Sequence, residues 1–173
     1  ADPKRLARNP KAWVLHPRDE WHGFEGLEDG YCMLDPIKVS VVTPGMSLEG
    51  KLKATGIPAP LLAAYLAAQG IVVEKTTDFA CLFLFSMGVT RGKWGTLVNA
   101  LLGFHRDIKA NTPLAQAIPA LAAAHSEQYG ALGLGDLATT MFAKVKKHRT
   151  TEFMSAAFGV LPVPELSPVQ AYE

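Results

Sequence analysis

The sequence predicts an α+β fold, a small, mostly antiparallel sheet covered by helices. Short apolar segments bounded by Pro, Gly or charged residues occur near residues 37–42, 71–76 and 80–86, with one helical segment between the first two. From residue 90 onward, apolar residues recur at helical spacing. A strand–helix–strand–strand order followed by helices is typical of a small sheet with helices on one side.

Length and composition limit what the chain can be. Its 173 residues suffice for one domain with a sizeable core, and 49% hydrophobic against 19% charged residues is the balance of a globular chain. A net charge of +1 favours neither nucleic acid nor an acidic membrane as a partner, and no apolar run reaches the roughly 20 residues of a membrane span. Cys32 and Cys81 form no C-x-x-C motif, so we expect free thiols in a reducing compartment, the cytoplasm.

The first part of the chain is predicted to hold little regular structure. Residues 1–30 are polar and rich in Pro and Gly, which indicates an irregular linker with one short strand near Ala12–Leu15. The run from Ile37 to Val42 alternates apolar and polar residues before a Pro-Gly pair, so it predicts a strand. Residues 46–56 are read as a polar connection.

A helix and two strands are predicted next. Ile57–Pro60 opens a helix that Gly70 closes. Ile71–Thr76 is the second strand and Ala80–Ser86 the third. Because the third strand is apolar throughout, we expect it to be central and covered on both faces.

The rest of the chain is predicted to be helical. Gly88 and Thr90 lead into a long helix, and a short one follows Pro113. Asp136 is expected to cap a further helix, whose basic end suits the negative end of the helix dipole. A last short helix is expected near Thr151–Phe158.

The sequence offers few candidates for chemistry. No histidine stands three or four residues from another histidine or from a cysteine, so no metal site is predicted. Gly88–Trp94 follows a strand and opens a helix, but three residues separate its glycines and Trp follows its lysine, which breaks the P-loop pattern. The helix start with Thr90, Arg91 and Lys93 can still hold an anion. A solvated tight turn is the alternative reading.

Glu74 and Lys75 stand between two apolar runs, where a buried sheet would carry no charge. Neighbours on a strand point to opposite faces, so the two side chains are not expected to pair. Solvent exposure at a strand end is the simple reading of Glu74. A carboxylate placed to meet a ligand's cation is the other.

Longer segments carry a more specific signal. In order along nearly the whole chain, they resemble the bacterial ornithine/lysine/arginine decarboxylases that depend on pyridoxal phosphate: Trp21-His22-Gly23-Phe24, Tyr31–Val39, Thr43–Met46, Gly56–Ala59, Gly70–Thr76 and Phe83–Gly88. Three segments look most like the degradative arginine decarboxylases: Thr76–Phe79, Gly88–Asn99 and Ala110–Ala115. Val73–Thr76 is closer to lysine-preferring members. Arginine is therefore favoured as the substrate, with lysine or ornithine as alternatives.

The resemblance implies one part of a fold-type-I enzyme of several domains. Residues 1–30 would be a linker from an upstream large domain, and residues 31–160 the α+β small domain that follows it. Residues 161–173 would begin a truncated C-terminal segment, in which Ser167-Pro168 is a helix-start signature. Family members form dimers and larger rings, so we expect a homo-oligomer.

The same resemblance assigns the chemistry. Pyridoxal 5'-phosphate would be bound mainly by the upstream domain, because this chain lacks the Ser-x-His-Lys motif of the family's cofactor-binding lysine. The chain is thus expected to hold no catalytic residue and to be inactive alone. It would close the active site and contact the substrate's distal cation, for which Glu74 is the best match. The alternative is a non-catalytic binding or regulatory domain derived from such an enzyme, with an anion site at Thr90–Lys93.

Overall fold

The computed structural model describes residues 2–17, 19, 26, 28–30, 32–47, 50–160 and 165–172. The elements up to the sheet are, in order, α1 Pro3–Ala7, the 3-10 helix η1 Pro10–Ala12, β1 Lys38–Val42, α2 Ala59–Ala68, β2 Lys75–Thr76 and β3 Ala80–Leu84. The helices after it are α3 Arg91–Ala110, α4 Leu114–Ala117, α5 Pro119–Ala124, α6 Ser126–Tyr129, α7 Leu134–His148, α8 Thr150–Gly159 and α9 Pro168–Tyr172. Three segments named above, Trp21–Phe24, Tyr31 and 161–164, lie outside the described residues.

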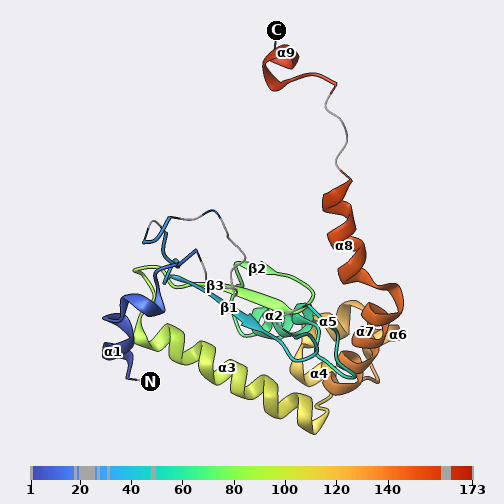
Figure 1. The fold of residues 1–173 in the computed structure, drawn as a ribbon. Coiled ribbons are helices and arrows are strands. Elements are labelled where there is room, and N and C mark those ends of the chain that lie inside the picture. The colour runs from blue at the N-terminus through green and yellow to red at the C-terminus, as the bar shows by residue number, and fades with distance from the viewer. Residues whose placement is uncertain are drawn as a thin grey trace.

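The three strands form one antiparallel sheet in the order β1-β3-β2. Cys81 at the middle of the sheet faces Val41 on β1 and Thr76 on β2. The α+β class and the central position of the third strand are therefore confirmed. Figure 1 shows the long helix α3 running along the sheet and the later helices grouped beyond one end of it.

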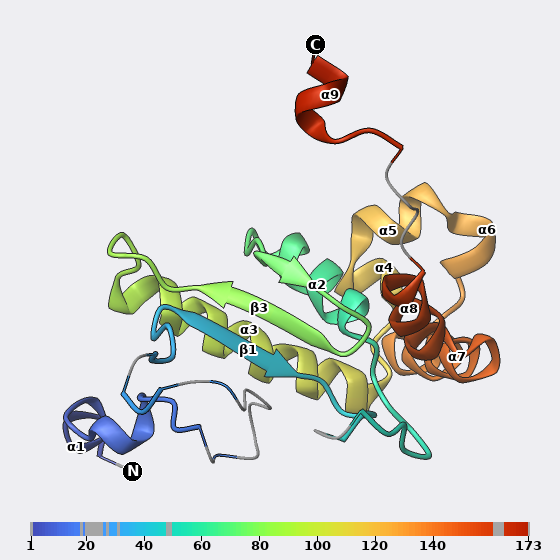
Figure 2. The same ribbon diagram turned by 45° about the horizontal axis from the view of Figure 1, so that its top comes forward.

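The two faces of the sheet differ in burial. Cys81 and Phe83 are buried toward the helices, and Figure 2 shows α3 running behind β1 and β3 on that side. On the opposite face Leu82 is half-buried and Leu84 is 41% exposed. The expectation that β3 is covered on both faces was therefore wrong, because the described helices pack against one face.

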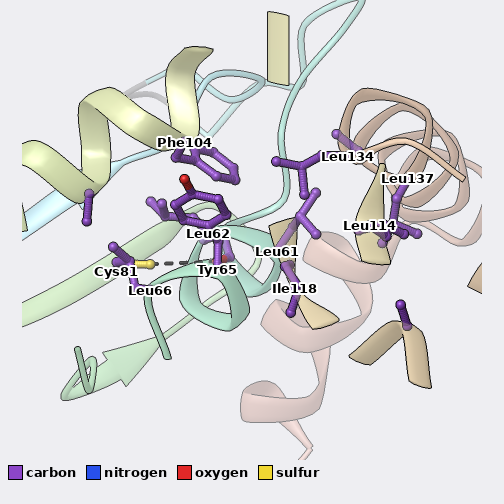
Figure 3. Packing of buried hydrophobic residues seen from close by; sticks show 14 of the residues in the cluster. Leu61, Leu62, Tyr65, Leu66, Cys81, Phe104, Leu114, Ile118, Leu134 and Leu137 are labelled. Atoms are coloured by element: carbon purple, nitrogen blue, oxygen red, sulfur yellow. Dashed lines mark hydrogen bonds between the residues drawn. The ribbon is translucent and has the colours of Figure 1, made fainter. Parts of the chain in front are cut away.

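One hydrophobic core joins α2, the sheet and the later helices. Figure 3 shows Tyr65 of α2 edge-to-face against Phe104 of α3, with ring centroids 5.2 Å apart. The buried residues of this core come from segments before and after the turn that joins β3 to α3. They include Leu61, Leu66, Cys81, Phe83, Leu114, Leu134 and Leu137. Cys32 and Cys81 are free, as predicted, and burial raises the pKa of the Cys81 thiol.

A second contact ties the loop after β1 to α7. Gly45, with φ +125°, and Gly56 approach so closely that a Cβ on Gly56 would lie 2.5 Å from the Gly45 Cα and would collide with the Phe142 ring. Phe142 of α7 in turn packs edge-to-face on Phe79, 5.7 Å away between centroids. The Thr-Pro-Gly and Gly-Ile-Pro segments that carried the resemblance thus have a packing role.

One predicted strand is much shorter than expected, and another is replaced by other local structure. The second strand, expected over Ile71–Thr76, is confined to Lys75–Thr76. The reason is that the Ile71 N–H donates to the Leu66 carbonyl at 3.0 Å and so caps α2 instead of pairing in the sheet. The strand expected near Ala12–Leu15 is replaced by η1 and by one isolated bridge from Val14.

The helix starts were predicted in part: the short helices α1, α5 and α6 were not expected, and one cap was misplaced. Thr90, expected to lead into α3, is its N-cap, and its hydroxyl accepts from the Lys93 N–H. Asp136 is not the N-cap of its helix but the third residue within it, where its carboxylate accepts from the N–H of the cap Gly133 at 3.3 Å. Ser167 accepts from the Gln170 N–H at the start of α9, as the Ser-Pro signature predicts. No helix in the described part of the chain has the length and apolar character to cross a membrane.

Candidate functional site

Glu74 lies at a bend one residue before β2, at the edge of the sheet. Its backbone N–H donates to the Leu82 carbonyl at 3.0 Å, which fixes the main chain beside β3. The side chain is exposed, and no described residue forms a hydrogen bond or an ion pair with its carboxylate. The carboxylate is therefore held by an ordered backbone while its oxygens stay available to a cation.

Lys75, the first residue of β2, is also exposed, and its backbone position is fixed by pairing within the sheet. It pairs with Leu82, whose side chain lies on the face away from the core. The next residue, Thr76, pairs with Cys81 on the core side. Lys75 is therefore a matched control for Glu74, with similar exposure and a neighbouring position.

The second candidate is the start of α3, where some of the donors already form hydrogen bonds within the same segment. The Lys93 ammonium donates to the Gly88 carbonyl at 3.1 Å, across the turn between β3 and α3. The Lys93 N–H is taken by the Thr90 hydroxyl. Arg91 is exposed. Of the two cationic side chains predicted to meet an anion, one is bonded within its own loop.

A hollow of about 360 Å³ lies beside the second candidate, the start of α3. Its walls come from the end of α2, the end of β3 and the start of α3. Val72, two residues before Glu74, lines it on one side, and Lys93 and Trp94 line it on the other. Most of the wall is apolar, so the hollow suits an aliphatic or aromatic group. Glu74 itself does not line it.

The lysines of this chain do not fit the role of a cofactor anchor. Every lysine in the sequence falls within the described residues, and each one is exposed. A lysine that holds pyridoxal phosphate needs an enclosed site from which water is excluded. In the described structure no lysine lies in such an enclosed site.

One polar group was missed by sequence reasoning. Asp107 of α3 accepts from the Tyr65 hydroxyl at 2.7 Å and from the Thr112 hydroxyl at 3.1 Å. Burial raises the pKa of Tyr65, and the hydrogen bond to Asp107 adds to this, so the hydroxyl stays protonated as a donor. Tyr65 and Asp107 are 42 residues apart, and no short motif joins them.

Comparison with known proteins gives consistent matches. The family model described as "Orn/Lys/Arg decarboxylase, major domain" matches residues 2–93. The biodegradative arginine decarboxylase of Escherichia coli K12 is 49% identical over 99% of this chain and 23% of its own length. The lysine decarboxylase LdcA of Pseudomonas aeruginosa is 45% identical over 93% of this chain and 21% of its own length.

A solved structure agrees in fold. The constitutive lysine decarboxylase of Escherichia coli superposes with a TM-score of 0.83 and 37% sequence identity, covering 92% of this chain and 22% of that chain. This chain thus spans about a quarter of the length of the curated relatives that it matches.

Proposed function

The chain belongs to the Orn/Lys/Arg decarboxylase family, and from that premise we propose that the protein of which it forms part removes CO2 from a basic amino acid, with arginine as the preferred substrate. The observation that carries the proposal is the 49% identity to an arginine decarboxylase across 99% of this chain. Pyridoxal phosphate, held by residues outside this chain, would supply the electron sink for decarboxylation. This chain would supply contacts to the substrate.

Glu74 is proposed to bind the distal cation of that substrate. Its carboxylate is exposed, and its backbone is fixed by the bond to Leu82. A carboxylate accepts two parallel N–H bonds from a guanidinium but presents only point-charge contacts to an ammonium. Glu74 could thus form paired hydrogen bonds with the guanidinium of arginine, and a simple charge contact with the ammonium of lysine or ornithine. When this part of the chain closes over the substrate, exclusion of water would strengthen the contact.

Residues 31–160 are proposed to act as one unit in that closure. The family model named for the major domain ends at residue 93, inside the first turn of α3. The buried core, however, joins Leu61 and Phe83 before that point to Phe104 and Leu134 after it. A boundary at residue 93 would cut through this core, which supports a single small domain. We further propose that the protein is a cytoplasmic homo-oligomer, a dimer or a larger ring.

A substrate panel on the full-length protein tests the proposed activity. We expect release of CO2 from arginine with a kcat/KM above that for lysine and for ornithine, and formation of the corresponding amine. A higher kcat/KM for lysine would change the preferred substrate from arginine to lysine and leave the family unchanged. Absence of CO2 from all three amino acids, with the cofactor bound, would contradict the proposal.

The second candidate function is a non-catalytic domain that binds an anion at Thr90–Lys93. What supports it is the hollow beside this helix start, with Lys93 on its wall. Against it stands the bond from the Lys93 ammonium to Gly88. The full-length sequence separates the two candidates, because a Ser-x-His-Lys motif upstream is expected for the enzyme and not for the binding domain.

A further inference from the structure

Asp107 is a half-buried carboxylate that forms no ion pair with any described residue. Its two hydrogen-bond donors, the Tyr65 and Thr112 hydroxyls, are both neutral. The ion pairs of the described residues lie elsewhere in the chain. A carboxylate offers about four acceptor positions, and two of these are used. The rest remain open to a further donor.

Asp107 lines a hollow of about 310 Å³, formed where α2, α3 and α4 meet. The wall has no lysine, arginine or histidine. Gln69 and Gln116 contribute amides, and Ala68, Ala117 and Pro119 contribute apolar surface. Arg106, the neighbour of Asp107 in sequence, is exposed and is not part of the wall, although its charge acts on the Tyr65 hydroxyl and works to lower the pKa of Tyr65. The volume is at the lower end of the range of about 300–1,000 Å³ seen for small-molecule sites.

Two helix ends add to the negative potential of this hollow. α2 ends at Ala68 and α3 at Ala110, and residues from the last turn of each line the wall. The C-terminal end of a helix carries a partial negative charge of about half an elementary charge. Asp107 in the last turn of α3 therefore lies where a negative charge is disfavoured and a cation is favoured. The carboxylate and these two helix ends act in the same sense, and the start of the short helix α5 at Pro119, which also lines the wall, opposes them.

We propose that this hollow binds a small organic cation, a primary alkylammonium or alkylguanidinium. The charged head would donate to Asp107, with the amide oxygens of Gln69 and Gln116 as further acceptors. The aliphatic part would lie along Ala68 and Pro119. The Tyr65 and Thr112 hydroxyls would act as positioning groups, because each holds one oxygen of the carboxylate.

Titration of the full-length protein with n-butylamine at neutral pH, followed by calorimetry, tests this site. The Glu74→Gln variant serves as the background, so that binding at the proposed substrate contact is already weakened. We expect Asp107→Asn to lower the affinity for butylammonium by about 10-fold or more, the size expected for a lost bond to a charged group. Glu127→Gln, which removes an exposed carboxylate elsewhere, should leave the affinity unchanged.

Gln116→Lys provides an independent test if Asp107→Asn impairs folding. A lysine at this position would place a tethered ammonium at the hollow, and we expect it to block added butylammonium. Unchanged butylammonium affinity in Gln116→Lys would overturn the proposal, as would 1-butanol binding as tightly as the amine. The readout requires no decarboxylation, so it fails or succeeds independently of the proposed activity.

Discussion

At the scale of single residues, the contrast between Glu74 and Asp107 is instructive. Both are carboxylates without a cationic partner among the described residues. Glu74 is exposed to solvent, so a cation that binds there displaces water from the carboxylate. Asp107 is half-buried and already orients its oxygens through two hydroxyls. The carboxylate of Asp107 is therefore held in one orientation before a cation binds, whereas the carboxylate of Glu74 is free to reorient toward a cation.

Gly56→Ala gives a direct test of the close approach between the loop after β1 and α7. The added Cβ would lie 2.5 Å from the Gly45 Cα and would strike the buried Phe142 ring. Because backbone and a packed ring must both shift, we expect the free energy of unfolding to fall by about 1–3 kcal/mol. Chemical unfolding of the full-length protein would measure this.

Gly95→Ala is the matched control for that substitution. Gly95 lies inside α3, and a Cβ added there would point into open space. Alanine should therefore stabilise the helix by about 0.5–1 kcal/mol. Equal effects of the two substitutions would show that the Gly45–Gly56 contact is not tight in solution.

At the scale of elements, local signals predicted the longer helices well and the short helices and the strands less well. The Thr90 cap and the Ser167-Pro168 start follow from side chains that bond their own backbone, so sequence alone could find them. Ile71–Val73 is an apolar run rich in β-branched residues, as in a strand, yet the Ile71 N–H bonds to the end of α2. Whether the Ile71 N–H bonds to α2 or to a strand depends on how α2 packs beside the sheet. A pattern of apolar residues does not predict that packing.

The start of α7 shows the same limit. Its N-cap is Gly133, which has no side chain to signal a cap, so sequence reasoning moved the cap to Asp136. Asp136 instead links two segments. Its carboxylate accepts from the Asn111 side-chain amide at 2.8 Å, and its N–H donates to the Asn111 amide oxygen at 3.0 Å. The end of α3 and the start of α7 are thereby joined.

Asp136→Ala should weaken this junction. The substitution removes the bonds from Gly133 and Asn111 and a negative charge at the positive end of α7. We expect a loss of about 0.5–2 kcal/mol in the free energy of unfolding, the usual range for a helix cap. Lys144→Ala, at an exposed position of the same helix, should change it by less than about 0.5 kcal/mol. Similar losses in both would contradict a specific capping role.

At the scale of the whole molecule, the fold class was predictable and the site only in part. The strand–helix–strand–strand order is local and was read from the sequence. Glu74 was identified because its charge interrupts an apolar run, and its substrate role came from the family resemblance. The Tyr65–Asp107–Thr112 group could not be found, since it is assembled by the packing of α2 against α3.

The location of the cofactor anchor is a further prediction at this scale. Every lysine of this chain is exposed, so borohydride reduction of the full-length protein with pyridoxal phosphate should attach the cofactor to a lysine outside residues 1–173. Peptide mapping of the reduced protein would locate it. A stoichiometric label on a lysine within this chain would overturn the assignment of the cofactor to another domain.

The most direct test of the central claim, that Glu74 meets the substrate's distal cation, is kcat/KM for arginine in the full-length protein and its Glu74→Gln variant. Loss of a hydrogen bond to a charged group should lower kcat/KM by about 10- to 150-fold, while the fold survives because Gln keeps the shape of Glu. Lys75→Gln should stay within about twofold of the parent. If Glu74→Gln stays within about twofold while Lys75→Gln impairs the enzyme, Glu74 is a solvated edge residue and the claim is wrong.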